Sequence, residues 1–226
     1  MSSAKDLTLS SCTLSPVTPP SSHTNQSDVR RQVLDAAIDI ITSDGVEHVS
    51  MREVARRAGI SHQAPYHYFG DRAGIFAAIS EEGFLGLSDA LHRADSSSTN
   101  AARDGLRAYL TFAMSHRGHF RVMFRNDICG ISSHESTLLA ADQAFNALLS
   151  VVNRVVDGEL NEGDTMVWAT TLWSIAHGLA TLVIDGPLMP RLAKQPGMDD
   201  TDVFLESVLD QFDTMVKQQA RTLFTT

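Results

Sequence analysis

The stretch that decides the fold is GVEHVSMREVARRAGISHQAPYHYFGDRAGIF, which runs from Gly45 to Phe76. Ser50–Glu53 (SMRE) has the pattern of a capping box, in which a Ser side chain and a Glu carboxylate each bind a free backbone N–H at a helix N-terminus. A short helix is therefore expected to start here, and Gly59–Ser61 follows it as a tight turn. The next segment, His62–Phe69, is short and rich in polar and aromatic residues. Two short helices joined by a glycine-containing turn predict a helix-turn-helix.

Helices are also expected on both sides of this motif. Before it lies an apolar stripe at helical spacing, formed by Leu34, Ala37, Ile38 and Ile41. After it, Asp71 is a candidate N-cap for a longer helix that reaches about residue 91. Beyond the serine run at 96–98, apolar residues keep a helical period, and the sequence predicts an all-α fold with an N-terminal three-helix helix-turn-helix domain. The further helices are expected at about 101–115, 120–124, 137–156, 165–184 and 202–223.

Composition and charge set the broad class of protein. The 226 residues are 43% hydrophobic, which is enough to bury a sizeable core. The net charge is −9, but six arginines balance six acidic residues over 29–74, so the acidity lies elsewhere in the chain. The two cysteines, Cys12 and Cys129, argue against a disulfide framework and against a cysteine metal cluster.

The chain shows no pattern expected of a membrane span or of a secretory signal. No apolar run reaches the roughly 18 to 20 residues that cross a bilayer, so we expect a soluble, cytoplasmic protein. Residues 1–26 are rich in Ser, Thr and Pro, and this composition predicts a disordered arm. The expected organisation is therefore an arm over 1–26, a helix-turn-helix domain over 27–74 and a second helical domain over 75–226.

Gly45–Phe76 strongly resembles the tetracycline-repressor (TetR) family of transcriptional regulators. The capped helix, the Ala-Gly-Ile-Ser turn and the Tyr-His-Tyr-Phe block follow one another in the family's order and without gaps. On pattern alone, the alternative is an ordinary helical hairpin with a polar face. The resemblance implies a domain that binds double-stranded DNA through the second helix of the motif.

The resemblance also implies which residues contact DNA. Ser50, Tyr66, His67 and Arg72 would hold backbone phosphates, which fixes the register of the protein on the duplex. His62, Gln63 and Ala64 would read bases, with Gln63 on an adenine edge and Ala64 on a thymine methyl group. The full set of expected DNA contacts is Ser50, Arg52, Ser61, His62, Gln63, Ala64, Tyr66, His67 and Arg72.

Pro65 departs from the family's usual pattern, which has an ordinary apolar residue at this position. Inside a helix, proline removes a hydrogen bond and clashes with the carbonyl four residues earlier. It also biases the preceding residue, Ala64, away from helical angles. Either the second helix starts late, with Pro65 in its first turn, or that turn is distorted.

The C-terminal half resembles a branch of the family whose regulatory domain carries a Trp-x-x-x-His-Gly signature, here Trp173, His177 and Gly178. Trp173 and His177 share one helical face at this spacing. A second group, of aromatic, Met and His residues, suits a pocket for a mostly apolar small molecule, and both groups suit an ordinary core equally well. The expected ligand contacts are Phe112, His116, Phe120, Met123, Phe124, Trp173 and His177.

His116 and His119 have a spacing at which two histidines can share a metal ion. Gly118 is expected to break the helix between them, and no acidic residue lies within a turn of either. The sequence therefore predicts no metal site, and it carries no motif for a cofactor.

The predicted helices 165–184 and 202–223 resemble the pair through which this family forms homodimers. The second has an apolar stripe of Phe204, Val208, Phe212 and Met215, widened by Leu205, Leu209 and Val216. Charged residues fall on its opposite side, namely Glu206, Asp210, Asp213 and Lys217. Packing within the subunit is the alternative for this stripe. A two-fold dimer would read a near-palindromic operator.

The resemblance implies a transcriptional repressor that leaves its operator when a small, mostly apolar effector binds. An enzyme is not expected, because the chain has no glycine-rich phosphate loop, serine elbow or zinc-protease motif. Two alternatives stay open at this point. One is a helical carrier or adaptor with a hairpin that mimics the motif, and the other is a regulator that activates transcription.

Overall fold

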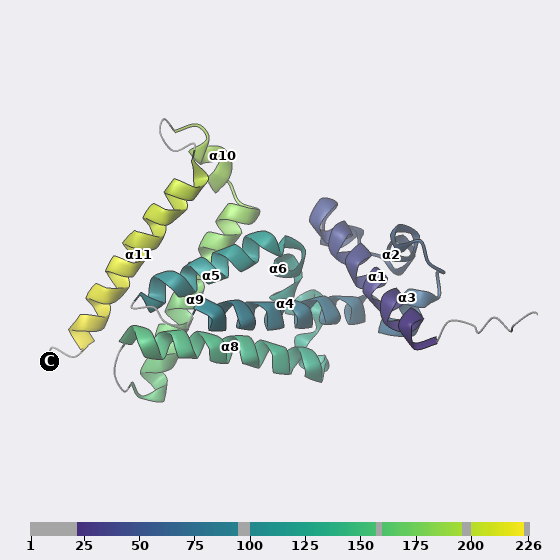
Figure 1. Cartoon of the computed structure of the whole chain (residues 1–226), viewed down its shortest axis with the longest axis horizontal. Coiled ribbons are helices and arrows are strands. Elements are labelled where there is room, and N and C mark those ends of the chain that lie inside the picture. The colour runs from purple at the N-terminus through teal and green to yellow at the C-terminus, as the bar shows by residue number, and fades with distance from the viewer. Residues whose placement is uncertain (1–21, 95–99, 157–159, 196–199, 224–226) are drawn as a thin grey trace, which may run out of the picture.

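The computed structural model of the chain describes residues 22–94, 100–156, 160–195 and 200–223. Within these ranges the chain forms helices and no strand, which confirms the all-α prediction (Figure 1). The N-terminal helices are α1 (Ser22–Ser43), η1 (Val46–His48), α2 (Met51–Ala58), α3 (Ala64–Phe69) and α4 (Arg72–Ala94). The others are α5 (Ala101–Ser115), α6 (Arg117–Met123), α7 (Asn126–Cys129), η2 (Ile131–Ser133), α8 (Glu135–Val156), α9 (Glu162–Ile184), α10 (Leu188–Leu192) and α11 (Thr201–Leu223).

The molecule has two parts that α4 connects. In Figure 1, α1, α2 and α3 lie together at one end, and α4 runs from this end into the remaining helices. We call the described residues up to 79 the head and those from 80 onward the body. Within the body, α4 packs against α5, α6 and α8, while α9 and α11 each pack against α5 and α8.

The motif that predicts the helix-turn-helix forms as expected, with one difference in its cap. The Ser50 hydroxyl accepts a hydrogen bond from the Glu53 N–H at 3.2 Å, which caps α2. The reciprocal half of the capping box is not made, because the Glu53 carboxylate binds the Arg56 guanidinium at 2.6 and 2.8 Å. Gly59 ends α2 in the left-handed conformation, with φ 68° and ψ 29°, which glycine adopts without steric cost.

Pro65 lies in the first turn of α3, so the helix starts late, as the first of the two alternatives proposes. Gln63 is the N-cap residue and Ala64 is the first helical residue. Proline is tolerated at this point because the first N–H groups of a helix have no intrahelical partner. His62 and Gln63 therefore lie in the turn that precedes α3.

Several helices differ by a few residues from their predicted bounds. The helix α1 begins at Ser22, so residues 22–26 of the predicted arm are helical, whereas residues 1–21 lie outside the described part. The prediction that Gly118 breaks a helix is wrong, because this residue lies inside α6. A Cβ atom there would lie 2.8 Å from Thr42 Oγ1 and 2.9 Å from Ile38 Cγ2. Glycine at this position therefore lets α6 approach α1 closely.

The head and the body each have a hydrophobic core, and α6 contributes to both. The head core joins α1, α2 and the first turns of α4, and it includes Val122 of α6. The body core joins α4, α5, α8, α9 and α11, and it includes Phe120 and Met123 of α6. One seven-residue helix thus packs against both parts of the molecule.

The helix α9 is apolar yet poorly covered. By length and composition it could cross a membrane, which differs from the expectation that no segment is long and apolar enough. Only 28% of its most apolar window is buried in the single chain. Apolar side chains on α9 that remain exposed are Met166, Val167, Trp173, Ile175 and Leu182.

Candidate functional site

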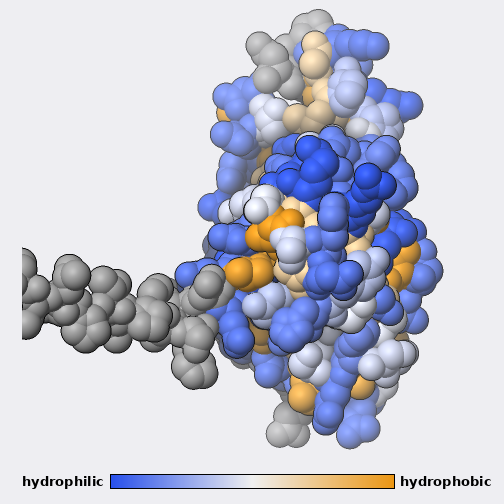
Figure 2. Space-filling view, turned by 90° about the vertical axis from the view of Figure 1, so that its right-hand side faces the viewer, coloured by the Kyte–Doolittle hydropathy of each residue, from blue (hydrophilic) through white to orange (hydrophobic). Residues whose placement is uncertain are grey.

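The predicted DNA contacts lie on one outward part of the head. The side chains of the turn before α3 and of α3 itself are exposed at His62, Gln63, Tyr66 and His67, and Ala64 is half-buried. Pro65, in contrast, is buried. Figure 2 faces the head end and shows mainly hydrophilic side chains there, with a few separate hydrophobic spots. The remaining predicted contacts, Ser50, Arg52, Ser61 and Arg72, are also exposed.

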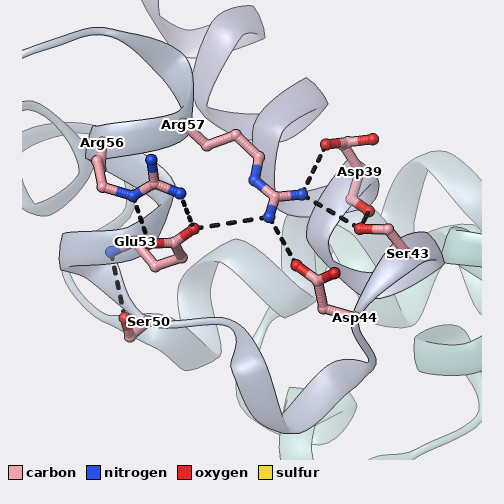
Figure 3. A network of polar contacts seen from close by, with 7 residues as sticks. All are labelled: Asp39, Ser43, Asp44, Ser50, Glu53, Arg56 and Arg57. Carbon is pink, nitrogen blue, oxygen red and sulfur yellow. Dashed lines mark hydrogen bonds and ion pairs between the residues drawn. The ribbon is translucent and has the colours of Figure 1, made fainter.

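Two arginines of α2 are held by carboxylates of the head (Figure 3). Arg57 donates to Asp39 at 2.8 Å and to Asp44 at 2.6 Å, which ties α2 to the end of α1. Its hydrogen bond keeps the pKa of the Asp44 carboxyl below its usual range. Arg56 binds Glu53 and likewise lowers the pKa of that carboxyl. Both arginines therefore stabilise the arrangement of the head and are neutralised locally.

The two arginines that are predicted to contact DNA, Arg52 and Arg72, differ in the contacts that they make within the head. Arg72 donates to the Val46 carbonyl oxygen at 2.8 Å, and its guanidinium lies 4.9 Å from the centre of the Phe76 ring. Arg52 is exposed at the start of α2 and makes no ion pair within the described part of the chain. Of the two, Arg52 is the one that is free to meet a phosphate in the present conformation.

The body contains a partly open cavity of about 340 Å³. Its wall comes from α4, α5, α8, α9 and α11, together with Phe124 after α6 and Ile131 of η2. A volume of this size falls in the range of small-molecule pockets, which are mostly apolar. The lining side chains are Phe84, Leu87, Leu91, Ala102, Gly105, Leu106, Tyr109, Phe124, Ile131, Ala141, Asp142, Ala144, Phe145, Leu148, Val151, Leu172, Trp173, Ala176 and Phe212.

Two of the seven predicted ligand contacts, Phe124 and Trp173, line this cavity. Phe120 and Met123 are buried beside it in the body core. Phe112 and His116 lie elsewhere, along an open groove between α4 and α5, with their rings stacked at 4.7 Å. Two of the predicted residues are thus part of the cavity wall, and the other five lie outside it.

A hydrogen bond connects His177 to Tyr109, which is a residue of the cavity wall. Tyr109 is not among the ligand contacts predicted from the sequence. The Tyr109 hydroxyl and His177 Nδ1 are 3.0 Å apart. Burial raises the pKa of Tyr109, and a weaker contact with Trp173 opposes this shift. Burial also lowers the pKa of His177, so both groups are favoured in their uncharged forms. Phe120 packs against both rings, with ring centres 6.1 Å from Tyr109 and 5.2 Å from His177.

The other missed residues have no common spacing, because five helices contribute to the wall. Tyr109, which lies between the apolar residues Ala108 and Leu110 of α5, was the available signal, since a buried tyrosine usually needs a partner for its hydroxyl. Examples of missed wall residues are Phe84, Leu106, Phe145 and Phe212.

Arg121 of α6 connects the head to the far end of the body. Its Nη1 donates to the carbonyl oxygens of Ile41 and Thr42, both at 3.0 Å, in the last turn of α1. Its Nε and Nη2 donate to Asp185 at 3.0 and 2.5 Å, directly after α9. One guanidinium therefore holds α1 and α9 in fixed relation, which its fork of donors makes geometrically specific.

His119 belongs to a second polar connection between α6 and the head. Its Nε2 lies 3.6 Å from Glu82 of α4, and Glu82 accepts hydrogen bonds from Arg31 of α1 at 2.9 and 3.0 Å. The His116 and His119 ring centres are 5.8 Å apart. Among the described residues, no group of three His, Cys, Asp or Glu side chains is placed to hold a metal ion.

Comparisons with known proteins identify both parts of the chain. The model of "Bacterial regulatory proteins, tetR family" matches residues 33–79, and the model of "Tetracyclin repressor-like, C-terminal domain" matches residues 102–212. A structure of a protein of unknown function from Rhodococcus sp. RHA1 is similar with a TM-score of 0.64 and 29% identity. That alignment covers 82% of this chain and 94% of the Rhodococcus chain.

Curated relatives align with a shorter part of the chain. The HTH-type transcriptional regulator BetI of Klebsiella pneumoniae (strain 342) is 37% identical over 62 residues, which are 27% of this chain. The uncharacterized HTH-type transcriptional regulator YxbF of Bacillus subtilis (strain 168) is 30% identical over 96 residues, which are 41% of it. The matches span 32% of the BetI chain and 25% of the YxbF chain. With family models on both the head and the body, the chain belongs to the TetR family of transcriptional regulators.

Proposed function

We propose that this protein is a sequence-specific DNA-binding repressor that acts as a homodimer and leaves its operator when a small, mostly apolar effector binds. The observation that carries the proposal is the connection between two features. An exposed polar face surrounds α3 in the head, an apolar cavity lies in the body, and α6 packs against both parts. We also assign the chain to the branch with the Trp-x-x-x-His-Gly signature, because Trp173 and His177 both contact Tyr109.

In this proposal the N-terminal end of α3 enters the major groove. His62, Gln63 and Ala64 lie at that end and reach base edges, which is where a recognition helix carries its reading residues. Phosphates are held around them by exposed groups of the head. These are the side chains of Ser50, Arg52, Ser61, Tyr66, His67 and Arg72.

The exposed face of α9 supports a homodimer. Val167 is 65% exposed, Met166 50% and Leu182 45%, and exposed apolar surface of this extent on one helix is typical of an interface. A Cβ atom at Gly178 would meet nothing within 4 Å, so another helix can approach closely at this point. A second copy of the chain that covers this face would also set the spacing of two recognition helices.

The contribution of α11 differs from the stripe expected from the sequence. Leu205, Leu209, Phe212 and Val216 are buried within the single chain, so this part of the stripe packs inside the subunit. Met215, in contrast, is 55% exposed. We therefore propose that α11 contributes its Met215 side to the dimer and its other side to the cavity wall, where Phe212 lies.

Release from DNA requires that the cavity influences the position of α3, and α6 supports such a route. Phe120 and the adjoining Phe124 contact the cavity residues Tyr109 and Trp173. From the same helix, Arg121 binds the end of α1. An effector that displaces the aromatic wall therefore shifts α6, and α1 carries the head with it. Such coupling amounts typically to about 1–3 kcal/mol.

The proposal is tested by binding of the purified full chain to labelled DNA from upstream of its own gene. Fluorescence anisotropy should show tighter binding to this DNA than to a random duplex, and footprinting should show symmetric protection. Gln63→Ala should change the preference at one base pair by about 1–3 kcal/mol. Arg72→Ala should weaken binding to all duplexes and lower the salt slope by about one.

Two results would overturn the proposal. Equal affinity for the upstream DNA and for random DNA would favour a carrier or adaptor with a helical hairpin. Protection of a single half-site at saturating protein would contradict the dimer. Tyr68→Phe is the matched control for the variants, because Tyr68 is half-buried on α3 and its ring packs against His67.

A further inference from the structure

The chemistry of the cavity wall restricts the charge of the effector. Apart from Tyr109, Trp173 and Asp142, the wall consists of aliphatic, phenylalanine and glycine residues. Asp142 is exposed, and it carries the single carboxylate among the residues of the wall. No Lys, Arg or His is part of the wall that the structure describes.

The arginines nearest in sequence to the wall residues of α5 are directed elsewhere. Arg103 binds Glu206 at 2.6 Å and Asp210 at 2.7 Å, and Arg107 binds Glu206 at 2.5 Å. These partners belong to α11, so both guanidinium groups are engaged between α5 and α11. Of the segments outside the described part, 95–99, 157–159, 196–199 and 224–226 contain no Lys or Arg, whereas 1–21 contains Lys5. The wall that the structure describes therefore offers no cation to a negative group in the cavity, which makes burial of such a group unfavourable.

The hydrogen-bonding group of the cavity is itself uncharged. Tyr109 is 5% exposed and its hydroxyl is fixed by His177 Nδ1 at 3.0 Å. A phenol in this position can exchange hydrogen bonds with an alcohol, phenol, amide or ketone without any buried charge. The surrounding rings of Phe84, Phe124, Phe145 and Trp173 offer flat apolar contacts to the rest of such a molecule.

We infer that the effector is an uncharged molecule with an apolar, ring-sized body and one hydrogen-bonding group that faces Tyr109. This inference rests on the proposed function, because it assigns the chemical class of the ligand of that cavity. Organic anions such as carboxylates are excluded as effectors by the absence of a cation in the wall and by the Asp142 carboxylate. Tyr109 is the residue that determines specificity for the polar group.

The test uses three small probes of matched shape, namely 4-butylphenol, 4-butylbenzoate and 4-butylbenzylammonium. Calorimetric titration of the full chain at neutral pH should give a Kd for the phenol that is at least about tenfold lower than for the benzoate, because the phenol is uncharged at this pH. Tyr109→Phe should remove most of the affinity for the phenol, because the hydrogen-bond partner of its hydroxyl is lost. The matched control Tyr68→Phe should retain it, since Tyr68 lies on α3 in the head.

The melting temperature of each variant is measured alongside, so that lost folding is not taken for lost binding. Should Tyr109→Phe fail to fold, His177→Gln tests the same hydrogen bond. Benzoate binding that equals or exceeds phenol binding would overturn the inference. So would tighter binding of the ammonium that Asp142→Asn abolishes, because the effector would then be a cation.

The results of the probe titrations can be distinguished from the results that test the proposed function. The probe titrations use the DNA-free chain, and they decide the inference alone. If the phenol binds with the expected preference and operator affinity stays unchanged, the inference stands and release by an effector fails. Absence of binding by all three probes would overturn the inference even if the chain binds its operator.

Discussion

The head and the body are built from similar apolar side chains, but they bury them to different degrees. In the head core, Val33, Leu34, Ile40, Ile41, Ile75 and Ile79 are 0% exposed. In the body, the wall residues Phe84, Leu87, Leu91, Leu172 and Phe212 retain 4–6% exposure, because they surround a cavity. The head is therefore closely packed around its core, whereas the helices of the body leave a cavity between them.

This difference predicts unequal costs for truncating two phenylalanines. Phe76 in the head core is 1% exposed, whereas Phe212 lines the cavity and is 6% exposed. Phe76→Ala should lower the free energy of unfolding by about 3–5 kcal/mol, since it leaves a void in a closely packed core. Phe212→Ala should cost about 2 kcal/mol, because its ring already lacks neighbours on one side. Urea denaturation measures the free energy of unfolding of both variants. Equal losses in the two variants would contradict the difference in packing between the head and the body.

Arg121 connects the head to the end of α9, and Arg121→Met tests this connection. The substitution removes the hydrogen bonds to Ile41, Thr42 and Asp185. We expect a change of about 1–3 kcal/mol in operator affinity, with the dimer still folded, because the position of α1 is no longer tied to α9. Anisotropy titration with operator DNA measures this change.

Arg125→Met is the matched control for Arg121→Met. Arg125 follows α6 and pairs with Asp127 at an exposed site, so it should leave operator affinity within about 0.5 kcal/mol of the unmodified protein. Asp185→Asn should act in the same direction as Arg121→Met. If Arg121→Met, Asp185→Asn and the control Arg125→Met all have the same operator affinity, the contacts of Arg121 do not position the head.

The body core also contains titratable groups, and the smallest expected effect concerns their response to pH. Burial lowers the pKa of His177, so below its ordinary value of about 6.5 the unfolded chain takes up a proton before the folded chain does. The free energy of unfolding should therefore fall as the pH drops below about 6.5. Tyr109 has a pKa raised by burial, so stability should also fall above about pH 10.

Urea denaturation across this pH range measures the contribution of His177. His177→Gln should flatten the acidic limb of the stability profile and leave the alkaline limb in place. If the profile keeps its full acidic slope in this variant, His177 does not supply the dependence.

The head was more predictable from the sequence than the body, for physical reasons. The capping box at Ser50 and the turn at Gly59 are local, because each depends on residues within a few positions. The late start of α3 followed from Pro65 as one of two alternatives. The internal neutralisation of Arg57 was not foreseen, since Asp39 and Asp44 reach it only through the fold.

The cavity depends on contacts between helices that lie far apart in the chain. Tyr109 and His177 are on α5 and α9, and no spacing rule connects them. Periodicity identifies which side of a helix is buried, but it does not distinguish a filled core from one with a cavity. Gly118 illustrates the same limit, because its role is the close approach of α1 to α6, which a helix-breaking rule does not represent.

The central claim is that the cavity and the DNA-binding surface are coupled, and reciprocity tests it most directly. The measurement is the Kd of 4-butylphenol for the dimer, by calorimetry, with and without saturating operator duplex. Because coupling acts equally in both directions, binding of the phenol should be about 5- to 150-fold weaker in the presence of operator. The phenol should weaken operator binding by the same factor. Equal phenol affinities with and without operator would contradict the account.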